Sequence, residues 1–245
     1  MAKTFLDIKN QIRTYLDESS AFDWTNPEVE REANAGYHEI ITSVMETYED
    51  FYLTTTQINT ITDQQEYTSV ESVPTDIFKI RRVEINYDVA NSNAQSSKAR
   101  SETMDHILNR LSDTTTGIYS EGQPVYYFQG FGSSTVLGFL PIPNNTDINA
   151  IKIWYIQEQS DMTSDTDAVN IPYADRYYSM AAKYAASVLL RKGQQEEASA
   201  DRLLREFDSD MERMKQQMED RIADNTKSIV VTDAENTNFS FFNQI

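Results

Sequence analysis

The chain has 245 residues, with 21 Lys and Arg against 39 Asp and Glu, and a formal net charge of −18. It contains no cysteine, which excludes disulfides, thiol catalysis and cysteine-ligated metals. It also lacks a block of basic residues that could displace counterions from a phosphate backbone, so sequence-specific DNA binding is disfavoured, whereas a wall past which DNA slides is not.

The N-terminal region, residues 1–52, has the pattern of two amphipathic helices. Its first residues, MAKTFLDIKNQ, lack the apolar stretch of a secretion signal, which predicts synthesis in the cytoplasm. Apolar residues from Phe5 to Leu16 repeat at intervals of three and four and predict the first helix. Asn26-Pro27 predicts an N-cap and first turn for a second helix that continues to about Phe51.

The middle region, residues 53–169, changes to a period typical of strands. Residues 53–70 are rich in Thr and β-branched side chains around a polar turn, and this favours a hairpin. Residues 78–87 predict a strand, 88–101 an exposed loop, and 102–111 a short helix. Three further strands are predicted in VYYFQG, STVLGFLPIP and NAIKIWYIQE.

The third region, residues 170–223, returns to helical spacing. Pro172 suits a first helical turn, and from Ala174 an Ala- and Tyr-rich helix runs to Gly193, which is expected at its C′ position. A second helix is predicted from about Gln195 to Ala223. Its apolar residues form nearly a heptad seam, made up of Leu204, Phe207, Met211, Met214, Met218 and Ile222.

The last region, residues 224–245, has no helical period and is rich in Asn, Thr and Ser, which predicts an extended tail. Together the four regions predict an α+β fold. In this fold the N- and C-terminal helices form a helical bundle, with a central antiparallel β-rich insert and an extended C-terminal tail. No run of about 18 apolar residues is present, so no membrane span is expected.

The order of these elements resembles the head-to-tail adaptor family of short-tailed bacteriophages, also called the connector or tail tubular protein A-like family. The resemblance covers about residues 4–222. The segments that carry it are TFLDIKNQIRTYLDE, NPEVEREANAGYHEII, VPTDIFKIRRVEI, FLPIPNNTDINAIKIWYI and NIPYADRYYSMAAKYAASVLLRKGQQEEASADRLLREFDSDMERM.

This resemblance implies a structural subunit of a ring, typically of twelve copies, rather than an enzyme. Such a ring attaches to the portal protein, extends the DNA channel and gives downstream tail or nozzle proteins a docking platform. DNA passes through without sequence-specific binding. The expected location is the head–tail junction of the virion, after assembly in the host cytoplasm, and no cofactor is expected.

The residue patterns leave two other functions open, a carboxylate-based cell-wall hydrolase and a generic helical scaffold. Glu28, Glu30 and Glu32 could supply acid/base chemistry, but acids at a helix start also favour the helix dipole. Asp161, Asp165 and Asp167 share one loop without the Gly and distal Glu of an EF-hand. No catalytic or metal-binding residue is therefore assigned.

Three further features complete the set of candidate sites. His38 and His106 have no partner at metal-ligand spacing. Arg81-Arg82 could contact an acidic neighbour or DNA phosphate, although a solvent-facing pair with local acids explains it more simply. Residues that could contact another subunit or the portal lie on the seam and in the tail, and they are Phe207, Met211, Met214, Met218, Phe239, Phe241 and Phe242.

The seam residues have two interpretations. The three Met side chains can form intrachain core, or they can present an adaptable face to a neighbouring subunit, because Met tolerates irregular packing. For the tail Phe residues, docking on a partner is the preferred hypothesis, because exposed aromatics reduce solubility.

Overall fold

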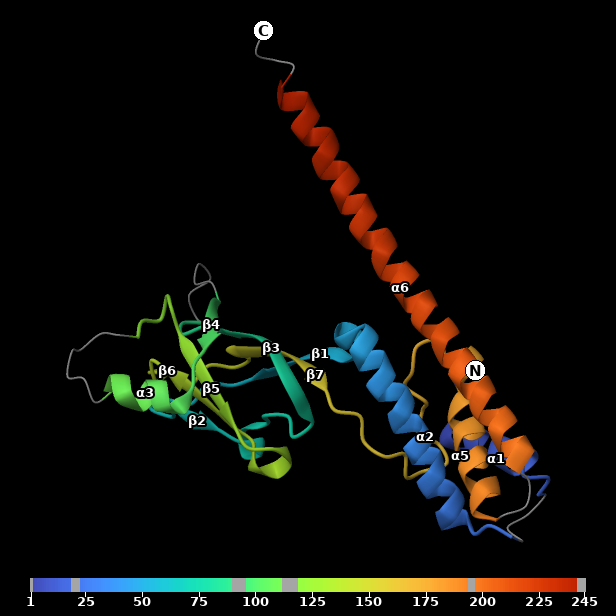
Figure 1. Cartoon of the computed structure of the whole chain (residues 1–245). Helices are drawn as coiled ribbons and strands as arrows, with labels where there is room; N and C mark the ends of the chain where they lie inside the picture. The colour runs from blue at the N-terminus through green and yellow to red at the C-terminus, as the bar shows by residue number, and fades with distance from the viewer. Residues whose placement is uncertain (1, 19–22, 90–95, 112–118, 194–196, 242–245) are drawn as a thin grey trace. The chain divides into compact units, whose positions relative to one another are not determined.

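The computed structural model describes residues 2–18, 23–89, 96–111, 119–193 and 197–241. Two compact units make up the chain (Figure 1). The helical unit contains residues Met1–Phe51 and Ser160–Ile245, and the sheet unit contains residues Tyr52–Gln159. Among the described residues, no helix is both long and apolar enough to cross a membrane.

The helical unit begins with two capped helices. Helix α1 (Phe5–Tyr15) buries Phe5, Ile8 and Ile12, which confirms the predicted apolar stripe. Helix α2 (Asn26–Thr47) is capped by Thr25, one residue before the predicted cap, because the Glu28 carboxylate accepts hydrogen bonds from both the backbone N–H and the hydroxyl of Thr25. The helix ends at Thr47, and the 3-10 helix η1 (Glu49–Tyr52) follows it, so the predicted end near Phe51 was too late.

Small residues allow α2 to lie close to α5 (Ser179–Lys192), which follows the short helix α4 (Ala174–Tyr177). A Cβ added at Gly36 would lie 2.8 Å from the carbonyl oxygen of Ala181. The α5 face is formed by buried alanines, namely Ala181, Ala182, Ala185 and Ala186. The predicted Ala-rich helix is confirmed from Ser179 to Lys192, but a break at Tyr178 separates it from α4. Gly193 is the C-cap residue in a right-handed conformation, with φ of −73°, and not the predicted C′ residue.

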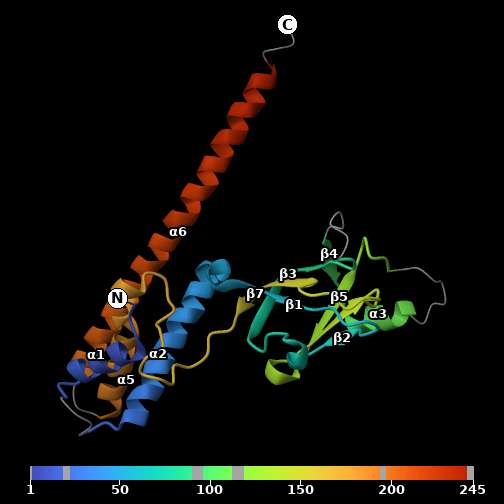
Figure 2. The same ribbon diagram turned by 180° about the vertical axis from the view of Figure 1, so that it is seen from behind.

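Helix α6 runs from Glu197 to Phe241, so the predicted extended tail was wrong. The chain has no Gly or Pro after Gly193, and therefore no residue stops a helix once it has formed. The Asn, Thr and Ser residues of this region each oppose the helix by only about 0.7 kcal/mol. Both views show α6 running back along α5 and continuing past its N-terminal end (Figures 1 and 2).

The sheet unit contains a seven-stranded curled sheet with strand order β1-β7-β3-β4-β5-β6-β2. The strands are β1 (Leu53–Ile58), β2 (Glu66–Tyr67), β3 (Ile77–Ile85), β4 (Ser97–Ser101), β5 (Val125–Gln129), β6 (Val136–Leu140) and β7 (Ile151–Gln157). The pair β4–β5 is parallel and the other pairs are antiparallel. The predicted strands at β3, β5, β6 and β7 are confirmed.

Two predictions for the sheet unit were wrong. The hairpin expected within residues 53–70 does not form, because β1 pairs with β7 and β2 pairs with β6. The loop expected at residues 88–101 includes strand β4, whose Lys98 and Ala99 lie opposite β3. In both places the strand pairs with a strand from a distant part of the sequence, and such pairing cannot be predicted from local turn residues.

One face of the sheet covers the main core of this unit, which contains Val83, Ile85, Ile151 and Ile153. On the other face, helix α3 (Met104–Leu111) covers β5 and β6 through Ile107. The short helices η2 (Ser69–Glu71) and η3 (Gly132–Ser134) complete the unit.

A glycine in β6 makes room for a tyrosine of β5. A side chain at Gly138 would overlap the ring of Tyr127, which lies opposite it across the strand pair. With this space available, the buried Tyr127 hydroxyl donates a 2.6 Å hydrogen bond to Glu66. Burial raises the pKa of Tyr127, and the neighbouring Glu66 carboxylate raises it further.

The predicted fold class was therefore wrong. The protein is a mixed α+β structure with a seven-stranded curled sheet and with helices mainly towards the two ends of the chain. A terminal helical bundle with a central antiparallel insert does not describe it, because the sheet contains a parallel pair and helices also lie between its strands. The extended tail is replaced by the distal half of α6.

Candidate functional site

The α6 seam lies inside the helical unit. Phe207, Met211, Met214 and Met218 are all buried, at 6%, 8%, 0% and 5% exposure. The seam begins at Leu203, which is buried, whereas the predicted first member, Leu204, is partly exposed. Ile222 lies where the structure describes the backbone only. The four buried residues thus act as intrachain core, and this part of α6 is held against the rest of the unit.

An ion pair at its side reinforces this packing. The Lys183 ammonium of α5 donates a 2.7 Å hydrogen bond to Asp210 of α6. Burial lowers the pKa of Lys183, but the hydrogen bond and charge of Asp210 outweigh this effect and raise it. The Lys183 ammonium therefore stays charged at neutral pH, and its hydrogen bond to Asp210 fixes α6 on α5.

The predicted tail contacts lie at the distal end of α6. The backbone at Phe239 and Phe241 belongs to this helix, and Phe242 lies outside the described residues.

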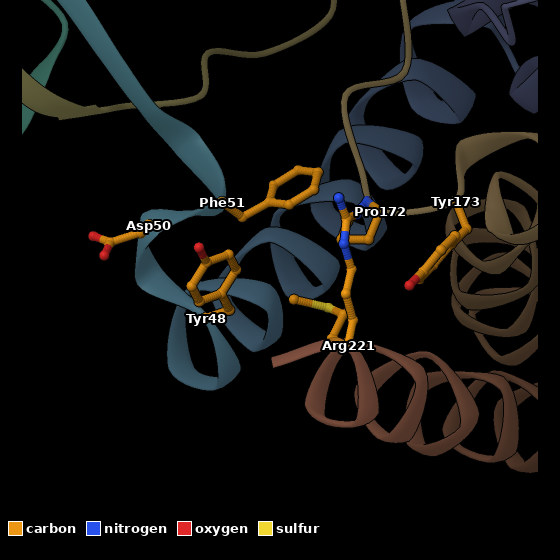
Figure 3. A pocket seen from close by; sticks show the side chains of 7 residues that line it. Tyr48, Asp50, Phe51, Pro172, Tyr173 and Arg221 are labelled. Carbon is orange, nitrogen blue, oxygen red and sulfur yellow. The ribbon is translucent and has the colours of Figure 1, made fainter. Parts of the chain in front are cut away.

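A pocket of about 330 Å³ lies in the helical unit beside the end of the seam. It is lined by Tyr48, Asp50, Phe51, Pro172, Tyr173, Met218 and Arg221. Figure 3 shows Tyr48 and Phe51 on one side, Tyr173 on the other, and the Arg221 side chain rising between them. The exposed rings of Tyr48 and Tyr173 provide stacking surfaces, and the Arg221 guanidinium provides a cation.

Tyr173 is held in an unusual conformation at the edge of this pocket. Its φ of 53° lies in the left-handed region, which is rare for a residue with a side chain. The ring nevertheless remains 41% exposed, and its hydroxyl donates a 3.3 Å hydrogen bond to the backbone oxygen of Gln217 in α6. The strained backbone thus presents an aromatic side chain to solvent.

The sheet unit has a separate apolar tip formed by η2 and η3. Val70 is 86% exposed and Phe131 is 84% exposed. Tyr67 of β2 pairs with Leu137 of β6, so the segment after β2, which contains η2, runs beside the β5–β6 connection, which contains η3. Both views show η2 and η3 side by side (Figures 1 and 2). Large apolar side chains presented in this way are typical of protein–protein contact sites.

The acidic residues considered for catalysis or metal binding all have structural partners, and Lys9 pairs with two of them, Glu30 and Asp165. Glu28 caps α2, Glu30 pairs with Lys9, and Glu32 accepts hydrogen bonds from Arg31 and Lys192. The Asp residues of the 160–169 loop also serve different partners, since Asp161 pairs with His38, Asp165 with Lys9, and Asp167 accepts from the backbone N–H groups of Thr163 and Ser164. Within the described ranges, no three His, Cys, Asp or Glu side chains form a group that could hold a metal.

The other two candidates also make local contacts. His106 lies 3.0 Å from the Glu102 carboxylate, one helical turn away. Arg82 pairs with Glu84 of the same strand, as expected for a basic residue with a local acid. Arg81 lies at a register shift between β3 and β7 and is exposed.

A comparison with protein families decides the identity of the chain. The family model for the SU10 adaptor protein matches residues 3–230. The chain belongs to the SU10 adaptor protein family. The predicted resemblance to a phage head-to-tail adaptor is thereby confirmed. The chain is accordingly a phage adaptor protein and a structural component of the virion. No curated protein matches it.

Two features of this SU10 adaptor family member were not predicted from its sequence. Phe131 was assigned no role from the sequence, although a Phe between two glycines has few neighbours that could bury it. The pocket could not be found, because its residues come from three distant segments and only their packing brings Tyr48, Tyr173 and Arg221 together.

Proposed function

We propose that this SU10 adaptor family member is a subunit of a closed head-to-tail adaptor ring. The resemblance described above implies a ring of about twelve copies. The ring attaches to the portal protein, extends the DNA channel and receives the next tail protein. The observation that carries this proposal is the family match over residues 3–230. The ring would sit at the head–tail junction after assembly in the host cytoplasm.

A closed ring requires heterologous contacts, in which one surface of each copy meets a different surface of the next. Its attachment to portal and tail requires further surfaces. The exposed tip at Val70 and Phe131 and the pocket beside Tyr173 are available for such contacts, because both present apolar groups to solvent. Exposed apolar groups that lie together can mark protein–protein contact sites.

We assign the portal contact to the distal part of α6. The seam at Phe207, Met211, Met214 and Met218 fastens the proximal part, so these side chains could meet a partner only after unpacking. The remaining candidates from the sequence, Phe239, Phe241 and Phe242, lie beyond that anchor. Aromatic side chains of this kind commonly supply most of the binding free energy at protein interfaces.

The negative charge of the chain suits passage of DNA. A net charge of −18 repels phosphate groups, so DNA can move past the ring without adhering. No sequence-specific contact is part of this function.

The test is the mass of the complex formed when the chain is mixed with purified portal particles. Native mass spectrometry is expected to show one ring of adaptor copies per portal. Deletion of residues 224–245 should abolish stable docking, while circular dichroism retains the helical signal of the anchored region. As a matched control, replacing Ser209 with Ala, at an exposed position within the retained part of α6, should leave docking unchanged.

Two results would contradict this assignment. Absence of any portal complex with the intact chain would remove the ring function. Normal docking after the deletion would remove the distal part of α6 from the portal contact while leaving the ring itself intact.

A further inference from the structure

Basic side chains gather on β3, β4 and β7, on the sheet face opposite the main core. The residue pairs Arg82–Trp154, Glu84–Lys152 and Glu84–Lys98 lie directly opposite each other on β3, β7 and β4. Residues opposite each other project from the same face of a sheet. Arg100 follows Lys98 by two positions on β4 and therefore shares this face. We call Arg82, Lys98, Arg100, Lys152 and Trp154 the cationic face.

Trp154 positions two basic side chains of the cationic face. The Lys152 ammonium lies 4.6 Å from the centre of the indole ring, and the Arg82 guanidinium lies 5.4 Å from it. Trp154 is only partly exposed, whereas Arg82, Lys98 and Arg100 are exposed. Two of the cations are therefore positioned before any partner arrives, which lowers the entropy cost of binding.

This concentration of charge contrasts with the composition of the chain. The sheet unit has seven Lys and Arg residues, and six of them lie on β3, β4 and β7. In the described part of the sheet unit, two acids form ion pairs with residues of the cationic face, Glu84 with Arg82 and Glu102 with Arg100. Four cations against two acids leave a positive surface on a strongly negative protein.

A surface of matching charge and spacing is present on α2. No Lys or Arg occurs between residues 32 and 78, and Glu39, Thr42 and Glu46 are exposed on the side of α2 opposite its buried Ile40 and Val44. Glu39 and Glu46 are seven residues apart, which is about 10.5 Å along a helix with a rotation of only about 20°.

The two lysines of the cationic face have nearly the same separation. Lys152 and Lys98 lie on either side of Glu84, with β3 between them. Two strand spacings correspond to about 9.6 Å. A helix laid across these strands could therefore place one carboxylate near each ammonium.

We propose that the cationic face binds the Glu39–Glu46 face of α2 from a second copy of the chain. This contact is heterologous, as ring closure requires, and the inference rests on the proposed ring function. Each copy would offer its cationic face to one neighbour and its acidic helix to the other. Charge complementarity then sets the register and direction of assembly.

DNA is the less favoured occupant of this face. Arg82 and Arg100 already engage Glu84 and Glu102, which weakens their attraction for phosphate. A net charge of −18 also opposes the approach of a polyanion. A second copy supplies carboxylates at a fixed spacing and is attracted only where the charges match.

The experiment uses two charge-reversed variants of the full chain. The first is K98E/K152E, and the second is E39K/E46K. A matched control, R202E/R213E, makes the same change in net charge as the first variant at two α6 residues whose side chains are each 69% exposed. Oligomer formation is measured by sedimentation velocity, with and without portal particles, and circular dichroism confirms that each variant is folded.

Each variant alone should associate at least about tenfold more weakly than the wild type, because like charges would meet at every contact. An equimolar mixture should regain assembly. In an alternating ring, the reversed face of each variant meets the reversed face of the other, and the two unchanged faces also meet. The control R202E/R213E should assemble like the wild type.

Other outcomes would overturn the inference. Wild-type assembly by K98E/K152E would exclude the cationic face and leave the ring function standing. Loss of assembly that mixing does not restore would show that this face meets DNA or another part of the same chain, and a gel-shift assay with duplex DNA would separate these cases. A wild type that forms no oligomer either alone or on the portal would contradict both the contact and the ring.

Discussion

Replacing Gly36 by Ala is expected to destabilise the helical unit, although the same change in an exposed helix would stabilise it. Ala is favoured over Gly in a helix interior by about 1 kcal/mol. At position 36 the new Cβ would lie 2.8 Å from the Ala181 carbonyl oxygen and 3.1 Å from the Tyr184 side chain. The first of these is a backbone atom, so α5 itself would have to shift.

Overpacking of this kind costs about 1–3 kcal/mol. Because a backbone atom is the nearest neighbour, we expect a cost near the upper end of that range. After the gain in helix propensity is subtracted, the net loss in the free energy of unfolding should be about 1–2 kcal/mol.

Urea denaturation of the full chain, followed by far-ultraviolet circular dichroism, measures this loss. Gly122 provides the control, because a Cβ added there meets nothing within 4 Å. The Gly122→Ala change should alter stability by less than about 0.5 kcal/mol. A Gly36→Ala variant as stable as the wild type, or more stable, would refute the close approach of α2 and α5.

Three further predictions concern single side chains. Met214 is fully buried, so Met214→Ala should lower the free energy of unfolding by about 2–5 kcal/mol in urea denaturation. A loss below about 1 kcal/mol would contradict its role in the core. Burial opposes ionisation of Glu32, but hydrogen bonds from Lys192 and Arg31 outweigh burial and lower its pKa below 4.5. The stabilisation that Glu32 provides should therefore be present above pH 4.5 and lost at lower pH. When the free energy of unfolding is measured against pH, Glu32→Gln should lose less stability in acid than the wild type, and an equal loss would exclude this residue as a cause. Phe131→Ser should leave stability within about 0.5 kcal/mol of the wild type but reduce recovery of the adaptor assembly, and full recovery would remove the apolar tip from the contacts.

The sequence predicted the elements that local signals define. The stripe of Phe5, Ile8 and Ile12 repeats within one short helix, and the Ala-rich helix ends at Gly193, so both could be recognised from a few neighbouring residues. Strands β5, β6 and β7 were found because Gly, Pro and Asn separate them in the sequence.

The failures arose where distant residues or cooperativity decide the structure. The partners of β1 and β2 lie about a hundred and about seventy residues further along the chain, so a local turn could not reveal them. The distal half of α6 was predicted as extended from its polar composition, but a helix that has already formed is extended at little cost for each residue.

The candidate site was less predictable than the fold. The seam of α6 was visible as a pattern, and only the structure shows that its side chains face the chain itself. The cationic face was invisible as a block of charge, because its residues are spread from position 82 to position 154 and become neighbours only through strand pairing.

The space above Gly138 has a consequence for how this protein can change over evolutionary time. Tyr127 occupies the volume that any other residue at position 138 would need. The two positions should therefore covary among relatives, with a smaller residue at 127 wherever 138 gains a side chain. Glu66, which accepts the Tyr127 hydrogen bond, should become free to vary in those same lineages.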